Sequence, residues 1–450
     1  MYRFSTYKEQ YKANLRLALP VVLTQLGQIL TQFADNLMVG RYGGDDPVPL
    51  AAVSFGGAVF FLFFITAIGV ALGMTPLVGE LFARGDREQS AKLLHNGILF
   101  YTLLGIGVTL AQYAVIPFMY RLGQPAEVVD AAIPYYRMLA LSMPFVMLFF
   151  AFKQFLEGVG NTKAEMAATI VANAANIVLN WIFIYGRCGF AQMGAEGAGL
   201  ATLLARILAM ALMIGYFCSR RRYRSYLDGF SLRNCSRRSI RQLLRMGLPI
   251  GSQMFLETSA FIGTGIMMGW FGTLALSANQ IAITLGNCAF MIVTSIGAAT
   301  TIRVSHCYGA RSIGELSLAA KASFHLVLIW NILAATVFIT LRHWIPTLFT
   351  TNAEVIAITS ELMFFVALYQ LSDGVQNVSV GILRGIQDVK VIMPIAFVSY
   401  WLLNLPVGYL FGFTLGMGPS GLFLGFSFGL SAAAVLMILR IRRSVRGLYA

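Results

Sequence analysis

Two stretches of the chain, 229 residues apart, carry the same pattern: LALPVVLTQ…NLMVGRYGG at Leu17–Gly44 and MGLPIGSQM…GIMMGWFGT at Met246–Thr273. At this shift Pro20 falls on Pro249. Farther along each copy the shift is slightly smaller: FLEGVGNTK (155–163) corresponds to ILRGIQDVK (382–390) at 227. Self-similarity at a fixed spacing predicts a repeated structural unit. The chain is therefore expected to consist of two homologous halves.

The composition places these halves in a membrane. Of the 450 residues, 58% are apolar and only 12% are charged, whereas soluble domains carry about a quarter charged residues. The apolar residues form runs longer than the ~20 residues that cross a bilayer as a helix. We predict twelve membrane-spanning helices, near residues 15–40, 49–82, 91–120, 128–157, 164–186, 195–219, 246–270, 274–303, 319–347, 354–384, 391–413 and 417–440.

Six spans in each copy fix the symmetry of the predicted fold. A repeat with an even number of spans enters and leaves on the same side, so both copies have the same orientation and are related by an axis along the membrane normal. We therefore predict an all-α polytopic membrane protein with two six-helix bundles related by pseudo-two-fold symmetry. The N-terminal lobe is 1–219, the basic cytoplasmic linker is 220–245, and the C-terminal lobe is 246–450.

The placement of basic residues predicts the topology and argues against a nucleic-acid partner. The chain has 33 Lys and Arg against 19 Asp and Glu, and the segment Arg220–Arg245 holds nine arginines and one acid, Asp228. Loops rich in Lys and Arg mark the cytoplasmic side and contact anionic lipid. We predict that both termini are cytoplasmic, that membrane lipid is a partner, and that the protein binds no nucleic acid.

Three acids lie inside predicted spans: Asp35, Glu257 and Asp373. Charges within spanning helices cost a few kcal/mol each and are functional candidates by default. Polar residues surround each acid at helical spacing: Gln25, Gln28 and Gln32 before Asp35, Gln253 before Glu257, and Tyr369 and Gln376 beside Asp373. Asn173, Asn176 and Asn180 form a further polar stripe, which packing between helices alone could explain.

The sequence offers no base in the middle of a span to neutralise these acids, because Lys153 and the arginines all map toward helix ends. An unpaired buried carboxylate avoids its desolvation cost either by holding a proton or by binding a cation. Both routes couple a transporter to an ion gradient. We therefore predict a secondary transporter that uses sodium or protons.

The chain resembles the multidrug and toxic compound extrusion family, in its NorM-like branch, over nearly its whole length. The motifs that carry the resemblance are LPVVLTQLGQ, FADNLMVGRYG, FLEGVGNTK, NIVLNWIFIYG, GLPIGSQMFLE and YQLSDGVQNVSVGILRG. The resemblance implies a monomeric antiporter of the bacterial inner membrane that exports small, cationic, amphipathic compounds by alternating access. The sequence shows no nucleophile–base set and no cofactor motif of an enzyme, so we expect no enzymatic activity and no cofactor besides the coupling ion.

The resemblance also assigns residues. It implies that Asp35 is the acid of the N-terminal lobe, with Asn176 and Asn180 as an asparagine pair; Gln32, from the glutamine stripe, completes this candidate substrate or cation site. It implies that Glu257 and Asp373, with Tyr369 nearby, form the ion-coupling site of the C-terminal lobe. The glutamate at position 257 is typical of the NorM-like branch and favours sodium as the metal ion.

Two other functions compete with this interpretation. A lipid-linked saccharide flippase of the same superfold would need a cationic cavity to hold a diphosphate, whereas the candidate cavity residues here are acidic. A channel would need a selectivity filter, and two asymmetric lobes fit alternating access better.

Overall fold

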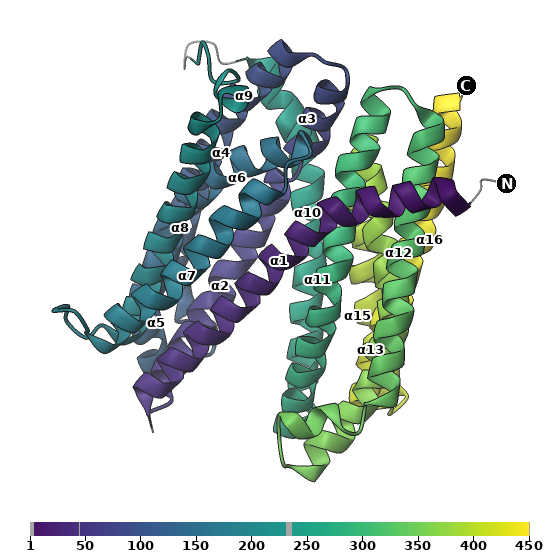
Figure 1. Cartoon of the computed structure of the whole chain (residues 1–450). Helices are drawn as coiled ribbons and strands as arrows, with labels where there is room; N and C mark the ends of the chain where they lie inside the picture. Colours follow the sequence, from purple (N-terminus) through teal and green to yellow (C-terminus); the bar gives the residue numbers. More distant parts are fainter. Residues whose placement is uncertain (1–3, 45, 231–235, 450) are drawn as a thin grey trace. The chain divides into compact units, whose positions relative to one another are not determined.

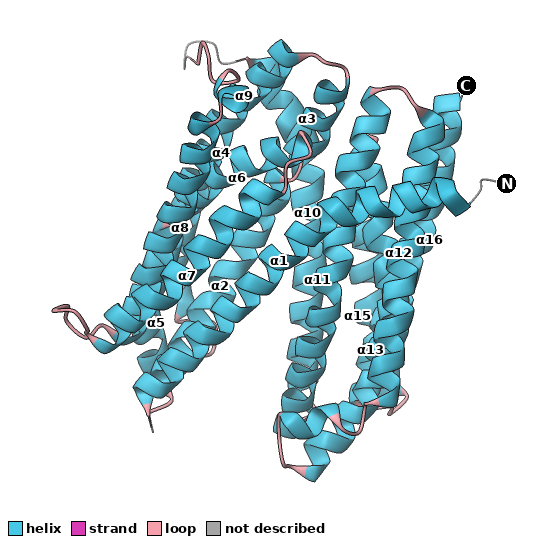
Figure 2. Ribbon diagram, in the orientation of Figure 1, coloured by secondary structure: helices cyan, strands magenta, loops and turns pink. Residues whose placement is uncertain are grey.

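The structure is a computed structural model. It describes residues 4–44, 46–230 and 236–449; residues 1–3, 45, 231–235 and 450, which include the middle of the predicted linker, lie outside the described part. All regular structure in the described residues is helical, with short connecting loops (Figure 2).

The helices group into two compact units by their contacts. The first unit, here called the N-terminal unit, is Leu23–Gly251, and the second, here called the C-terminal unit, is Ser252–Ala450 together with Met1–Val22. Two long helices therefore contribute to both units, and each passes from one unit to the other two residues after a proline, Pro20 in one and Pro249 in the other.

The N-terminal unit is a bundle of long helices that lie side by side (Figure 1). Its elements are the greater part of α1 (Phe4–Gly43), then α2 (Val48–Ala71), α3 (Met74–Ala83), α4 (Arg87–Met119), α5 (Ala126–Leu141), α6 (Met143–Gly158), α7 (Lys163–Tyr185), α8 (Gly194–Ser219), the short α9 (Arg221–Arg224) and the start of α10 (Arg237–Gly269).

The C-terminal unit repeats this plan, with α13 packed against α11, α12 and α16 (Figure 1). Its elements are the rest of α10, then α11 (Thr273–Gly309), α12 (Ile313–Thr340), the 3₁₀ turn η2 (Ile345–Leu348), α13 (Ala353–Gly385), a broken span α14 (Ile392–Ala396), η3 (Phe397–Asn404), α15 (Leu405–Tyr409) and η4 (Leu410–Thr414), and finally α16 (Pro419–Tyr449). The segments η3 and η4 are π-helical.

Eleven helical segments of the described residues are long and apolar enough to cross a membrane. The remaining predicted span, near 246–270, lies in α10. This helix has 33 residues, and its sequence includes the polar residues Gln253 and Glu257; it is not among the eleven. The predicted all-helical class of membrane protein is confirmed. The proposal of two six-span lobes, with boundaries at 219/220 and 245/246, stays a prediction.

Several predicted helix boundaries are wrong by more than a few residues. The helix predicted to start at residue 15 starts at Phe4, because polar residues of its first turns have partners within the C-terminal unit. Arg303 donates to the backbone carbonyl of Gln10 over 3.0 Å and to Oδ1 of Asn14 over 2.9 Å. The helix predicted over 319–347 starts at Ile313 and ends at Thr340; a separate 3₁₀ turn, Ile345–Leu348, follows and contains Pro346.

One predicted span is broken at Ser142, between α5 and α6. Proline at position 144 has no backbone N–H and cannot donate to the carbonyl of Ala140 four residues earlier. The hydroxyl of Thr109 on α4 donates to that carbonyl instead, over 2.8 Å. The break leaves the Ser142 side chain inside the bundle, where it is fully buried.

The internal repeat is visible in the hydrogen bonds. The hydroxyl of Thr75 donates to the backbone carbonyl of Gln154 over 3.3 Å in the N-terminal unit, and Thr301 donates to that of Gly381 over 3.2 Å in the C-terminal unit. The two pairs are related by the sequence shift of about 227 residues. The scaffold contacts between helices are therefore duplicated.

The loop after α13 is tied to α16 by an ion pair. Arg440 donates to both carboxylate oxygens of Asp388, over 2.6 and 3.0 Å, and Ser444 donates over 2.5 Å. Partial burial alone would raise the pKa of Asp388, but the hydrogen bonds from Arg440 and Ser444 outweigh it, so this pKa lies below its ordinary value.

Replacing Asp388 by Asn should lower the midpoint of thermal unfolding in detergent by about 1–3 °C at pH 7, because a half-exposed ion pair contributes about 1 kcal/mol or less. A carboxylate with a lowered pKa stabilises the fold above its unfolded pKa of about 3.9. The difference between wild type and D388N should therefore shrink as the pH falls below about 4. The matched control is D228N, at an exposed acid; equal effects of both variants at pH 7 would contradict the assignment.

Candidate functional site

The C-terminal unit holds a chain of polar side chains that begins on α10. The amide of Gln253 donates to the carboxylate of Glu257, one turn further along the helix, over 2.7 Å. Gln253 is buried and Glu257 is half-buried. The spacing of four residues places both side chains on one face of α10.

Helix α13 supplies the facing residues. Tyr369, Asp373 and Gln376 are all buried and follow helical spacing, so they share one face of α13. The carboxylates of Asp373 and Glu257 interact electrostatically. The structure thus brings together the three residues that the sequence suggests as an ion-coupling site.

Tyr400 joins the two helices and was not expected from the sequence. It lies in the π-helical segment η3 and is fully buried. Its hydroxyl donates to Oε1 of Gln376 over 2.9 Å and also makes a hydrogen bond with Glu257. Single π-helical turns inside spans often occur at functional sites, and the polar pair Ser399 and Tyr400 within an apolar run is the sequence signal that could have indicated this one.

A base reaches this site, contrary to the prediction that none is available. Arg384 lies in the last turn of α13, at a helix end as expected. Its guanidinium nevertheless donates to Oε1 of Gln253 over 3.0 Å and interacts electrostatically with Glu257. The prediction is wrong because it was based on the position of the arginine backbone near the helix end. The long side chain carries the guanidinium several ångströms away from that position.

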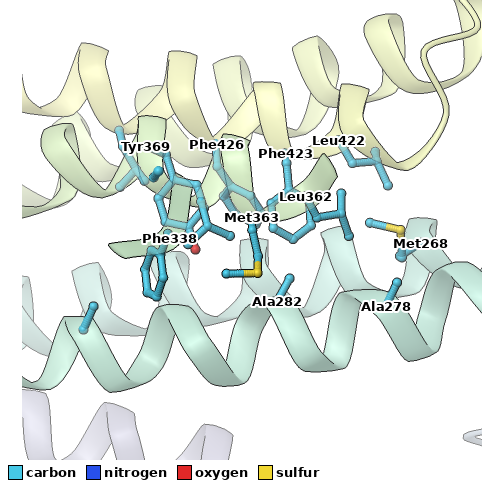
Figure 3. Close-up of a cluster of buried hydrophobic side chains, with 14 of the residues drawn as sticks. Met268, Ala278, Ala282, Phe338, Leu362, Met363, Tyr369, Leu422, Phe423 and Phe426 are labelled. Atoms are coloured by element: carbon cyan, nitrogen blue, oxygen red, sulfur yellow. The ribbon is translucent and has the colours of Figure 1, made fainter. Parts of the chain in front are cut away.

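One side of the site is apolar. Tyr369 belongs to a cluster of buried hydrophobic side chains that includes Met363, Phe423 and Phe426 (Figure 3). Its ring centroid lies 5.7 Å from that of Phe426 and 6.3 Å from that of Phe423. Apolar surroundings have a low dielectric constant and therefore strengthen the repulsion between the two nearby carboxylates.

The N-terminal unit holds a second polar group around Asp35 on α1. The amide of Asn180 donates to the carboxylate of Asp35, and its nitrogen also lies 3.0 Å from Oδ1 of Asn176. Asn176 in turn donates to Thr202 on α8 over 3.4 Å. Both asparagines are buried, whereas Gln32, the fourth predicted member, is exposed on α1.

Arg206 accompanies this second group and corrects the prediction that spans contain no central base. It is the thirteenth of the 26 residues of α8. Its guanidinium donates to Oγ of Ser142 over 2.5 Å, lies 4.9 Å from the ring centroid of Phe60, and interacts electrostatically with Asp35. Aromatic faces stabilise cations, so Arg206 is held by the break at Ser142 and by an aromatic surface.

A further charged group in the same unit lies outside the predicted site. Lys153 on α6 pairs with Glu165 on α7 over 2.5 Å and lies 4.0 Å from Glu157. Glu157 also accepts from Thr75 over 3.4 Å. Burial of this group between α3, α6 and α7 suggests a structural role.

Comparisons with known proteins agree with the resemblance. The family model MatE matches residues 20–182 and again 249–410, once in each copy of the repeat. The chain is 30% identical over 440 residues to Multidrug resistance protein NorM of Photobacterium profundum, covering 97% of this chain and 96% of that protein.

Solved structures agree in fold. A MOP superfamily transporter from Pyrococcus furiosus Vc1, described as having a binding pocket of reverse polarity, superposes with a TM-score of 0.88 at 21% identity, covering 98% of this chain and 97% of that one. An outward-facing multidrug resistance MATE family transporter of the MOP superfamily gives 0.87 at 21% identity with the same coverage.

Gly286 provides a test of the packing around Tyr369. A Cβ at position 286 would lie 2.9 Å from the Tyr369 hydroxyl, whereas a Cβ at Gly265 would meet nothing within 4 Å. Gly to Ala in a helix otherwise stabilises by roughly 0.5–1 kcal/mol, and overpacking costs about 1–3 kcal/mol. G286A should therefore unfold at a lower temperature than G265A, as measured by tryptophan fluorescence; equal stabilisation by both would contradict the placement of Tyr369.

Proposed function

The chain belongs to the MatE family of membrane transporters, and on that premise we propose that it is a cation-coupled antiporter that exports organic cations and drugs across the bacterial inner membrane. Sodium or protons drive the exchange by alternating access. The name of the Photobacterium relative, a multidrug resistance protein, supports this substrate class.

The observation that carries the proposal is the interaction of Glu257 with Asp373 in a buried setting. Two carboxylates in a medium of low dielectric constant repel each other unless a cation or a proton lies between them. One nearby guanidinium, that of Arg384, offsets only one of the two negative charges. The site therefore favours binding of a further positive charge.

Tyr400 gives the site a way to accommodate either ion. When Tyr400 donates to Gln376, its oxygen accepts a second hydrogen bond only from a protonated Glu257. When the Gln376 amide is turned, its nitrogen donates to Tyr400 and Tyr400 donates to an ionised Glu257; amide orientation is an assigned feature of structures. The first arrangement suits a proton, and the second suits sodium bound to carboxylate and neutral oxygens. Tyr369, beside Asp373, offers one such neutral oxygen.

The group around Asp35 is proposed to bind the substrate cation. Asp35 supplies the charge, Asn176 and Asn180 supply hydrogen bonds, and the exposed Gln32 lies one turn away on α1. Arg206 interacts with the same carboxylate, so an organic cation would compete with an internal guanidinium. The aromatic rings of Phe60 and Phe64, which lie against Arg206, are surfaces of the type that binds organic cations.

A lipid-linked saccharide flippase remains the alternative within the superfold. It would hold a diphosphate in a cluster of several bases. Among the residues that the structure describes, each candidate site contains a single arginine accompanied by at least one acid, Arg206 with Asp35 and Arg384 with Glu257. This charge pattern supports the export of cations.

The proposal includes the topology and assembly predicted from the sequence. Exposed arginines surround α9 and the start of α10, namely Arg220, Arg221, Arg222, Arg224, Arg237, Arg238, Arg241 and Arg245. Such a surface favours contact with anionic lipid on the cytoplasmic side. We propose that both termini are cytoplasmic and that the protein acts as a monomer.

Competition between the coupling ion and the substrate gives the main test. Linkage requires that each weaken the binding of the other by the same factor, typically about 5–150-fold. In purified protein at constant ionic strength, sodium or acidification should lower the affinity for ethidium, measured by fluorescence. E257Q and D373N should abolish this effect, because the one remaining negative charge is offset by the positive charge of Arg384 and no longer requires an added cation.

S259A, at a neighbouring position of α10 whose hydroxyl donates to a backbone carbonyl of its own helix, is the matched control and should keep the competition. Wild-type competition in both E257Q and D373N would place the coupling site elsewhere. Competition by acid alone would identify the proton as the coupling ion.

Opposite changes at Asp35 and Arg206 test the substrate site. D35N should weaken ethidium binding about tenfold or more, equivalent to about 1.4 kcal/mol. R206Q should strengthen it, because Asp35 would lose its internal competitor, and R206K should fall in between. Weaker binding in R206Q, with unchanged unfolding temperature, would contradict competition between Arg206 and the substrate.

A further inference from the structure

We propose that Arg384 limits the Glu257/Asp373 site to one monovalent cation at a time. The inference rests on the proposed function of this site and adds the number of charges that it accepts. It assigns Arg384 as a positioning residue that determines ion specificity without itself binding the ion.

A chain of hydrogen bonds connects Arg384 to Glu257. The guanidinium of Arg384 donates to Oε1 of Gln253 over 3.0 Å, and Nε2 of the same amide donates to Glu257 over 2.7 Å. Gln253 is only 4% exposed, so water offers little competition for either bond. Arg384 therefore reaches Glu257 through one buried amide.

The charged groups at the site add up to one net negative charge. Within the described residues, the titratable groups that interact with Glu257 or Asp373 are Arg384 and the phenols of Tyr369 and Tyr400. Phenols have an ordinary pKa of about 10 and are neutral at pH 7. Two carboxylates and one guanidinium leave one negative charge. One sodium ion cancels it, whereas a divalent ion would leave an uncompensated positive charge in an apolar setting.

Arg384 also fixes the orientation of the Gln253 amide. An arginine can only donate hydrogen bonds, so the amide oxygen must face Arg384 and the amide nitrogen must face Glu257. The amide oxygen is thereby kept away from the ion. Removing Arg384 would free Gln253 to turn and present an additional oxygen, which suits a divalent ion such as Ca²⁺ with its six to eight oxygen ligands.

Arg384 is not part of the duplicated scaffold. At the shift of 227 residues, Arg384 corresponds to Glu157 in the N-terminal half. Glu157 belongs to the buried group with Lys153 and Glu165. The two halves thus have opposite charges at this position, which fits a specialised role for the arginine in the C-terminal half.

The experiment measures displacement of ethidium from the purified full-length protein by NaCl and by CaCl₂, with choline chloride keeping the ionic strength constant. For each variant the readout is the ratio of the calcium to the sodium concentration at half displacement. R384Q should lower this ratio at least about tenfold. R245Q, which removes an exposed arginine of α10 and so changes the net charge equally, should keep the wild-type ratio, and R384K should restore it.

Equal calcium to sodium ratios in R384Q and R245Q would overturn the inference while leaving ion coupling in place. Displacement of ethidium by acid but not by sodium would also overturn it, because the site would then accept no monovalent metal ion. A wild-type protein that responds to neither sodium nor pH would overturn the proposed function itself.

Discussion

A carboxylate in the interior of a helix bundle has to be neutralised, because the desolvation of a charge there costs several kcal/mol. Glu257 and Asp373 place two negative charges within one site, and the positive charge of Arg384 offsets one of them. The remaining negative charge is the physical basis of the proposed mechanism. It makes the binding of a cation or proton favourable, and it makes the loss of that ion depend on the arrival of another positive charge.

The two halves share the packing contacts of the scaffold but differ in their charged groups. The repeat supplies equivalent contacts between helices, as in the bonds from Thr75 and Thr301 to the backbone. The charged groups differ: Asp35 in the N-terminal unit is accompanied by Arg206, and the acids of the C-terminal unit outnumber their base. Balanced charge suits a site where an organic cation exchanges with an internal one, and excess negative charge suits a site for an inorganic ion.

Periodicity and composition predicted the helical spans. They also indicated the candidate charged residues, because a charge within a spanning helix has a high desolvation cost and is therefore rare. The family resemblance, and not periodicity, implied the groups of Asp35 with Asn180 and of Glu257 with Asp373, and the structure brings the members of each group together. Periodicity and composition could not predict Arg206 or Arg384 as partners, since the reach of a long side chain depends on how its helix packs. The early start of α1 was also hidden, because Gln10 and Asn14 find partners almost 300 residues later in the chain.

The most direct test of the central claim is transport itself. Purified protein reconstituted into vesicles should export ethidium against its concentration gradient when a sodium gradient or a pH gradient is imposed, and the export should stop when the gradient is collapsed by an ionophore. The charge of the Glu257/Asp373 site requires that at least one of the two gradients drive this uphill movement. Ethidium that only equilibrates across the membrane, whichever gradient is imposed, would contradict the account.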